Sequence, residues 1–338
     1  MNNEKKIKIY TLNGYKNYGN RLQLFALSSV IKQYEMNALV YWPITRKERI
    51  KNIVKRTILK RKYKKEYKFY RFTKKYLPKR TDNIMPIGIY GSDQIWNSNY
   101  YDKRPYLLNI WRGLTKISYA ASIGKEIISK KERQLFADAL ETYDAVSVRE
   151  QSAKDLLQPL TDKRIEVVLD PTLLLDREEY QQLEKKPKDL TENEKYILCY
   201  ILGNRDHEEK IEKFAKEKGY KTIYFSDKRD SSYGIEEFLY LIHRAQLICT
   251  DSFHACVFSF IFERPFVAFK RTGEANYMYT RLQNLIETFN LKNREFNGKE
   301  ITKENLEVDY TEAKKILKKE QKKSLDFLKR ALDIKDEN

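Results

Sequence analysis

A short polar turn between two apolar segments, around Ser252, combines residue types that suit the binding of an anion. We expect a buried strand to end at Thr250 and an apolar helix to begin at Phe253. The N–H groups in the first turn of such a helix, together with its dipole, attract anions. Ser252 is placed to cap this helix, and the His254 imidazole would lie in its first turn. In the alternative interpretation Asp251 or Ser252 only caps the helix, and His254 only bonds a neighbouring loop.

A second candidate is the segment from Gly91 to Asn97, in which a carboxylate, two amides and a tryptophan follow a predicted strand. Asp93 comes after a Gly-Ser turn, and Gln94 and Asn97 flank Trp96. Such sets suit a sugar, because its C–H faces stack on aromatic rings while its hydroxyls bond carboxylates and amides. The alternative interpretation is a capping aspartate and a core tryptophan.

Two further segments offer groups for a phosphate or carboxylate. The loop before the first predicted helix matches neither a dinucleotide-binding nor a Walker A pattern, and is either an anion cradle or a plain tight turn. Its candidate residues are Asn17, Gly19, Asn20 and Arg21. Arg149 follows an apolar strand, where a guanidinium can hold a carboxylate or phosphate through two hydrogen bonds. Its partner could equally be Glu150 or Asp170, in an internal salt bridge.

Alternating strands and helices must position these residues. Short apolar strands are predicted at residues 6–10, 87–90, 116–121, 145–148, 165–169, 196–200, 221–225, 246–250 and 265–269. Helical patterns fall at residues 22–33, 132–143, 208–218, 235–244, 253–262, 276–289 and 311–332. This alternation is typical of parallel sheets whose ligand sites lie at the carboxyl ends of the strands. A charged stretch at residues 176–194 interrupts it, so we predict an α/β protein with two Rossmann-like parallel-sheet domains facing a cleft, residues 1–175 and residues 176–338.

Length and composition agree with this organisation. The chain of 338 residues suits two domains, and 41% hydrophobic residues supply enough apolar surface to exclude wholesale disorder. No apolar run reaches the roughly 18 residues of a bilayer span, and the N-terminus is polar, so we expect a cytoplasmic protein. The three cysteines lie within apolar runs and form no CxxC pair, which indicates reduced core residues rather than disulfides or zinc ligands.

The net charge of +18 is concentrated in one segment. Residues 46–80 contain 17 Lys and Arg against Glu48 and Glu66, a local net charge of +15. Apolar residues at helical spacing among these cations are typical of helices that lie on anionic membranes. RNA binding is the competing interpretation, although the segment matches none of the usual nucleic-acid modules. The third interpretation is a solvated helix with no binding role.

Six motifs, taken in order, resemble those of the polysaccharide pyruvyl transferase family. They are NYGNRLQ at 17–23, GSDQIWN at 91–97, SYAASIG at 118–124, VRE at 148–150, DPTLL at 170–174 and TDSFH at 250–254. The resemblance extends over most of the chain, from residue 17 to about residue 290. It implies the transfer of pyruvate from phosphoenolpyruvate onto a sugar of a cell-surface glycan, to give a cyclic ketal. It also implies a two-domain fold like that of the GT-B glycosyltransferases.

The resemblance assigns roles to the candidate residues. The histidine of the family's donor-binding motif corresponds to His254, and the arginine of its Arg-Glu motif corresponds to Arg149. This histidine stands in a Ser-Phe-His or an Arg-Leu-His context in the family, and Ser252 stands where relatives with Arg-Leu-His have an arginine, so the donor must find another cation. The candidates for this cation are Arg21, Lys270 and Arg271. We expect His254 to act as donor ligand and acid, Arg149 as anion clamp and Asp93 as hydroxyl ligand or base.

The resemblance also divides the site between the two domains and suggests partners. The acceptor-side residues are Asn17, Gly19, Asn20, Arg21, Gln94, Trp96 and Asn97. The donor-binding residues are Arg149, from the N-terminal domain, and Asp251, Ser252, Phe253, His254, Lys270 and Arg271, from the C-terminal domain. No cofactor or metal is expected beyond phosphoenolpyruvate as donor substrate. Acceptors in such pathways are often carried on polyprenyl diphosphate, so the basic segment 46–80 would hold a peripheral protein on the anionic inner face of the membrane. Nucleic acid is not expected as a partner.

Two other functions are consistent with the sequence. A glycosyltransferase of the same fold would use a nucleotide sugar instead of phosphoenolpyruvate. A non-catalytic binder of RNA or another anionic polymer would depend mainly on the basic segment. Its binding would fall steeply with salt and would not depend on His254 or Arg149.

Overall fold

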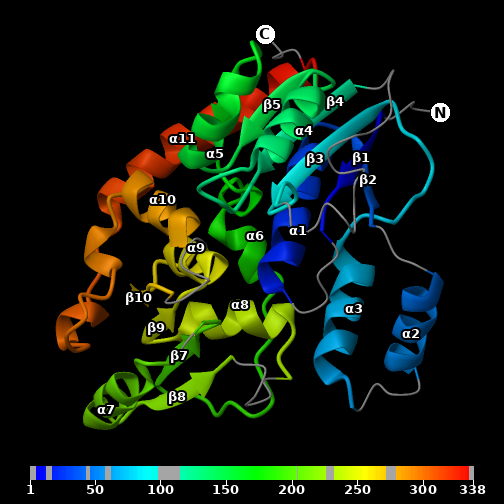
Figure 1. The fold of residues 1–338 in the computed structure, drawn as a ribbon. Helices are drawn as coiled ribbons and strands as arrows, with labels where there is room; N and C mark the ends of the chain where they lie inside the picture. Colours follow the sequence, from blue (N-terminus) through cyan, green and yellow to red (C-terminus); the bar gives the residue numbers. More distant parts are fainter. Residues whose placement is uncertain are drawn as a thin grey trace. The chain divides into compact units, whose positions relative to one another are not determined.

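The computed structural model describes residues 5–12, 17–42, 46–57, 62–97, 115–203, 205–225, 232–271 and 279–334. The chain divides into two compact units, whose helices and strands are labelled in Figure 1. Unit 1 comprises residues 1–58, 73–175 and 318–338, and unit 2 comprises residues 59–72 and 176–317.

Within the described residues, unit 1 is built on a six-stranded parallel sheet, sheet A, in the order β2-β1-β3-β4-β5-β6. Its strands are β1 Lys6–Tyr10, β2 Asn37–Tyr41, β3 Ile87–Asp93, β4 Thr115–Ala121, β5 Ala145–Val148 and β6 Ile165–Val167. Its helices are α1 Tyr18–Gln33, α2 Arg46–Thr57, α4 Lys130–Leu140 and α5 Gln151–Leu157. The inner strands are buried along almost their whole length, as expected where helices cover both faces of a parallel sheet.

Unit 2 contains a four-stranded parallel sheet, sheet B, in the order β10-β9-β7-β8 among the described residues. Its strands are β7 Tyr196–Tyr200, β8 Lys221–Tyr224, β9 Leu247–Thr250 and β10 Phe266–Ala268. Its helices are α6 Arg177–Gln181, α7 Glu208–Lys218, α8 Ile235–Arg244, α9 Phe253–Ile261 and α10 Thr280–Thr288. The three cysteines are free and buried in this unit, as the apolar runs around them predicted. Burial also raises the pKa of Cys249, which keeps this thiol protonated and unreactive.

Local signals explain where several helices begin and end. Ser129 and Glu132 form a capping box at the start of α4, in which each side chain bonds the backbone N–H of the other residue. Gly219 ends α7 in the left-handed conformation, at φ +65°, which glycine adopts without steric cost. The predicted strand–helix alternation is therefore realised with ordinary capping chemistry.

The final helix corrects one predicted domain assignment. The sequence analysis placed residues 318–338 with the C-terminal domain, but α11, Thr311–Ala331, continues from unit 2 into unit 1. There the Ser324 hydroxyl accepts a hydrogen bond from Leu169 N at 2.9 Å. The Phe327 ring lies 6.2 Å from that of Tyr119. The apolar stripe of this half of α11 is thus buried against unit 1.

The basic segment 46–80 forms two helices, α2 and α3, Lys64–Tyr76, while residues 58–61 lie outside the described part of the chain. In α3 the division between the units falls after Phe72, so the segment does not belong wholly to the N-terminal unit as predicted. Phe69 and Phe72 on α3 are fully buried. Part of the apolar face predicted for this segment therefore belongs to the interior of the protein.

Candidate active site

Each sheet has a point where the chain changes the side on which it adds strands. In sheet A, β2 pairs on one side of β1 and β3 on the other. In sheet B, β8 and β9 likewise flank β7. Ligand sites in open parallel sheets lie at such switch points, beyond the carboxyl ends of the strands. Each unit therefore has one position at which its fold favours a site.

Residues that follow β1 form hydrogen bonds that link the strands at the switch point of sheet A. Asn17 caps α1, because its Oδ1 accepts a hydrogen bond from Asn20 N at 3.1 Å. Gln23 Nε2 donates to Thr11 Oγ1 at 2.9 Å, and Gln23 Oε1 accepts from Ser92 N at 3.2 Å. This glutamine, which the sequence analysis did not select, thus joins the ends of β1 and β3.

Arg21 lies inside unit 1. It is fully buried, and its guanidinium carbon is 4.7 Å from the centre of the Trp42 ring, a favourable cation–π arrangement. Its Nη1 also donates to Asn20 Oδ1 at 3.2 Å. Gly19 and Asn20 are buried beside it in the same helical turn. These contacts place Arg21 in the interior of unit 1.

Four buried charged residues gather at the ends of β3, β5 and β6. We call Asp93, Arg149, Glu150 and Asp170 the carboxylate–arginine cluster. Arg149 Nη1 donates to Asp170 Oδ2 at 2.7 Å. Arg149 Nη2 lies 3.9 Å from Asp93 Oδ1, and its Nε lies 3.7 Å from Glu150 Oε2. Each member is at most 5% exposed. One guanidinium is thus shared among three carboxylates, and the internal salt bridge foreseen as an alternative for Arg149 is present.

The surroundings of Arg149 bear on its predicted role as an anion clamp. Burial by itself would lower its pKa, since a buried charge loses its hydration. Asp170, Glu150 and Asp93 outweigh this effect and raise the pKa of Arg149. The guanidinium therefore stays charged, but a phosphate or carboxylate ligand would meet three carboxylates beside it. This geometry favours Arg149 as the residue that positions the carboxylates.

Glu150 and Asp170 are held by further hydrogen bonds. Glu150 Oε1 accepts from Ser122 Oγ at 2.7 Å and from Ile123 N at 3.2 Å. Asp170 Oδ1 accepts from Thr172 Oγ1 at 2.7 Å and from Thr172 N at 3.0 Å. Each carboxylate is thus held rigidly by several donors. The sequence analysis named both residues only as possible partners of Arg149, although both belong to the ordered motifs, which was the available signal.

Asp93 turns the chain sharply at the end of β3. Its φ of +67° lies in the left-handed region, which few residues other than glycine adopt and which aspartate tolerates better than most. Its Oδ1 accepts a hydrogen bond from Gln94 N at 2.9 Å. Non-glycine residues in this conformation gather at functional sites, where the surrounding structure offsets the strain.

The role predicted for Trp96 is wrong. Its ring packs edge-on against Phe136 and Tyr143, with centres 6.0 and 5.9 Å away, and the residue is 1% exposed. No face of this ring is left for a sugar, so the core tryptophan named as the alternative is what the structure contains. Gln94 and Asn97 are also buried, and Asn97 Nδ2 donates to Gln94 Oε1 at 3.2 Å.

In unit 2 the β9–α9 loop, residues 250–254, lies at the switch point of sheet B. The Asp251 carboxylate accepts hydrogen bonds from Leu202 N at 2.8 Å and Gly203 N at 2.7 Å, just beyond β7. Arg271, which follows β10, donates from Nε to Asp251 Oδ2 at 3.1 Å. It also donates from Nη2 to the Asp251 carbonyl oxygen at 3.2 Å. Asp251 therefore joins the ends of three strands and brings a guanidinium to the loop.

His254 lies in the first turn of α9, immediately beyond β9, and is 7% exposed. The Phe253 ring stands nearly perpendicular to the imidazole, with ring centres 5.1 Å apart. Ser252 is the N-cap residue, but within the described structure its side chain makes no capping hydrogen bond. The first N–H groups of any helix have no partner within that helix. The start of α9 thus has the composition of an anion site with an imidazole beside it.

Of the two cations that follow β10, only Arg271 comes to this loop in the described structure. Lys270 Nζ lies 3.7 Å from Glu295 Oε1 and 5.3 Å from the centre of the Tyr279 ring, and its side chain is largely exposed. Lys270 is therefore a surface residue with a partner of its own. Arg271 is the better candidate for the cation that Ser252 does not supply.

The two other histidines make their contacts outside the β9–α9 loop. His207 stacks on Phe269 with ring centres 4.8 Å apart, and burial lowers its pKa. His243 Nδ1 lies 2.6 Å from Glu184 Oε1, and its ring stacks on Phe262. His254 is thus the histidine that lies both just beyond the end of a strand, β9, and in the first turn of a helix, α9.

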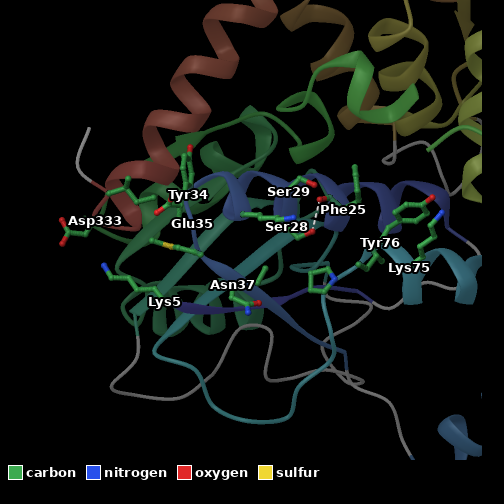
Figure 2. A pocket seen from close by; sticks show the side chains of 16 residues that line it. Lys5, Phe25, Ser28, Ser29, Tyr34, Glu35, Asn37, Lys75, Tyr76 and Asp333 are labelled. Atoms are coloured by element: carbon green, nitrogen blue, oxygen red, sulfur yellow. Dashed lines mark hydrogen bonds between the residues drawn. The ribbon is translucent and has the colours of Figure 1, made fainter. Parts of the chain in front are cut away.

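A groove of about 1140 Å³ lies at the amino ends of the strands of sheet A, where Lys5 precedes β1 and Asn37 begins β2. Figure 2 shows Lys5 and Asp333 at one end of this groove and Lys75 at the other. Because it faces the amino ends of these strands, the groove is separate from the switch point of sheet A, which lies at their carboxyl ends. We do not include it in the candidate site.

The two parallel sheets, each with a switch point at the carboxyl ends of its strands, define a two-domain α/β protein of the GT-B type. The family model of the polysaccharide pyruvyl transferases matches residues 17–272, which is most of the chain. The chain therefore belongs to the polysaccharide pyruvyl transferase family.

One solved structure supports the fold, and a second is reported as a weaker similarity. The MnaA–UDP complex of S. aureus aligns over 99% of this chain and 98% of its own, with 10% identity and a TM-score of 0.51. The UDP-GlcNAc 2-epimerase of Methanocaldococcus jannaschii aligns over 93% of this chain and 92% of its own, with 11% identity and a TM-score of 0.47. At such identities the similarity concerns the fold alone. A search of curated protein sequences found no match.

Proposed function

We propose that the protein transfers the pyruvyl group of phosphoenolpyruvate onto a sugar of a cell-surface glycan, forming a cyclic ketal. The proposal depends on the position of His254 at the start of α9, in a chain of the polysaccharide pyruvyl transferase family. The helix end offers N–H groups to the phosphate or carboxylate of the donor. Arg271, bonded to Asp251 in the same loop, would add a positive charge.

The reaction needs an acid, a base and an anion site. A proton added to the methylene carbon of phosphoenolpyruvate makes it a methyl group and leaves an oxocarbenium-like carbon beside it. Two sugar oxygens bond to this carbon, and its bond to the phosphate oxygen breaks. One hydroxyl proton restores the acid, and the other leaves with the phosphate. We assign the acid to His254. We assign to Asp93 the role of the base that receives the second hydroxyl proton and passes it to the departing phosphate.

The remaining residues would bind and position. We assign Arg149 to holding the carboxylates of the cluster, because Asp170 already occupies its Nη1 at 2.7 Å. Asn17, Asn20, Gln94 and Asn97 are the candidates for contacts with the acceptor sugar. Each of them carries an amide that can both donate to and accept from a hydroxyl.

We further propose that the acceptor is carried on polyprenyl diphosphate. Such a substrate would lie at the cytoplasmic face of a membrane, so the protein would act there as a peripheral protein. The excess of cations in residues 46–80 supports this location, since anionic lipids attract basic segments.

Donor binding tests the proposal before the acceptor is known. We expect phosphoenolpyruvate to raise the melting temperature of the wild-type protein, because a ligand that binds only the folded state stabilises it. His254→Ala should abolish this increase. His207→Ala is the matched control, because His207 stacks on Phe269 outside the loop, and this variant should respond like the wild type.

Turnover provides the second measurement. With a suitable glycan acceptor, His254→Ala should lower kcat/KM for phosphate release by roughly 100-fold or more, the usual contribution of a general acid. A melting temperature that rises with a nucleotide sugar and not with phosphoenolpyruvate would instead identify a glycosyltransferase of the same fold. Full pyruvyl transfer by His254→Ala would remove the imidazole from the mechanism.

A further inference from the structure

Helix α2 carries three aliphatic side chains that the fold leaves exposed. Ile50, Ile53 and Val54 are 57%, 51% and 36% exposed, and their spacing of i, i+3 and i+4 places them on one face of the helix. The other large hydrophobic residues exposed to this degree, among those described, are Ile84, Ile127 and Leu202. Single exposed residues of this kind are common, whereas three gathered on one helical face indicate an interaction surface.

The same helix is strongly basic. Residues 46–57 contain six Lys and Arg against Glu48. Lys47 and Lys51, one helical turn apart, are both exposed. A second copy of this chain would present the same charge and be repelled. The surface therefore fits an anionic partner that can also accept aliphatic side chains.

Helix α3 differs from α2 in both respects. Its Phe69 and Phe72 are fully buried, and its Lys68 Nζ lies 2.6 Å from Glu237 Oε1. Part of its apolar face and part of its charge are thus used inside the protein. This contrast places the interaction surface on α2 and not on the basic segment as a whole.

The kind of apolar residue distinguishes a lipid from a nucleic acid. Residues 46–57 contain no aromatic side chain on which a base could stack, and stacking is the usual means by which proteins hold single-stranded RNA. Cations around an aliphatic face are typical of helices that lie on anionic bilayers. Twelve helical residues span about 18 Å, which is too short to cross a hydrocarbon core of about 30 Å. Among the described helices, none has the length and apolar character needed to span a membrane.

We propose that α2 docks the protein on an anionic lipid surface, with Ile50, Ile53 and Val54 among the acyl chains and Lys47 and Lys51 at the headgroups. The helix would lie in the plane of the bilayer surface. This inference gives the membrane location under the proposed function a specific contact, but it depends on α2 alone and does not require pyruvyl transfer.

Vesicle flotation of the full-length protein tests this inference. We expect wild-type protein to float with vesicles of phosphatidylcholine and phosphatidylglycerol, and not with phosphatidylcholine alone. Replacing Ile50, Ile53 and Val54 together by serine should weaken binding by roughly tenfold or more. The matched apolar control replaces Ile84 and Ile127 by serine, and binding should stay within about twofold of the wild type.

Charge is tested in the same way. Lys47→Glu with Lys51→Glu should also weaken binding by roughly tenfold or more. Lys318→Glu with Lys322→Glu, an exposed pair with the same spacing on α11, should not. Circular dichroism and melting temperature establish that each variant is folded. Equal flotation with neutral and anionic vesicles would overturn the proposal, as would wild-type binding by the serine variant. Tighter binding to RNA than to vesicles, unchanged by the serine substitutions, would also overturn it. Because flotation measures no turnover, its outcome is independent of the proposed reaction.

Discussion

Replacing Arg149 by methionine should destabilise unit 1 strongly. The Arg149–Asp170 salt bridge has a distance of 2.7 Å, and its side chains are 3% and 0% exposed. Methionine keeps most of the volume of the side chain but leaves Asp170 in the interior without its nearest cation. Breaking a buried pair by removing one partner costs about 3–5 kcal/mol. We expect a loss of this size in the free energy of unfolding of unit 1.

Tryptophan fluorescence during urea unfolding can follow this unit selectively. The three tryptophans, Trp42, Trp96 and Trp111, all fall in the segments that make up unit 1. The double variant Arg149→Met with Asp170→Asn should recover part of the loss, since no unpaired carboxylate remains at position 170.

Arg330→Met is the matched control for this experiment. Arg330 lies 2.9 Å from Glu166 in unit 1, but 59% of its side chain is exposed. Its loss should cost less than about 1 kcal/mol, as for other surface ion pairs. If Arg149→Met unfolds at the same urea concentration as the wild type but no longer binds phosphoenolpyruvate, Arg149 is a donor ligand. That result would refute the positioning role.

Three further predictions concern other parts of the fold. Asp251→Asn should lower the free energy of unfolding by about 1.5–3 kcal/mol in thermal unfolding, because a neutral amide replaces the charged carboxylate that accepts these hydrogen bonds. An unchanged melting temperature would contradict this. Gly91→Ala should cost more than Gly219→Ala, since a Cβ at position 91 would lie 1.8 Å from the Tyr119 carbonyl oxygen while position 219 has open space. Equal yields and melting temperatures for the two variants would count against this. Ser324→Ala should cost about 1–3 kcal/mol by tryptophan fluorescence, because a buried N–H loses its acceptor. Unfolding at the wild-type urea concentration, as followed by tryptophan fluorescence, would argue against the assignment of this half of α11 to unit 1.

The sequence indicated most strands because buried parallel strands read as short apolar runs. It missed β2, an edge strand, although residues 38–41 form a short apolar run; most residues of this strand are only partly buried. The change of unit within α11 could not be predicted either. An amphipathic stripe shows that a helix packs, but not against which part of the chain.

The candidate site was predicted by residue type better than by role. The motifs located Asp93, Arg149 and Asp251 at strand ends, because the ends of apolar runs can be read from the sequence. Whether an arginine binds a ligand or an internal carboxylate depends on distances between residues far apart in the chain. The 2.7 Å contact between Arg149 and Asp170 supplies this information. Trp96 shows the same limit, since its residue type suits a sugar and a hydrophobic core equally.

The chain passes between its two units four times, at residues 58–59, 72–73, 175–176 and 317–318. Neither unit is therefore one uninterrupted stretch, and no single truncation would yield either of them intact. During synthesis on the ribosome, unit 2 has all its residues once position 317 has emerged. Unit 1 must wait for the second half of α11, so the lobe that begins first is the last to be completed.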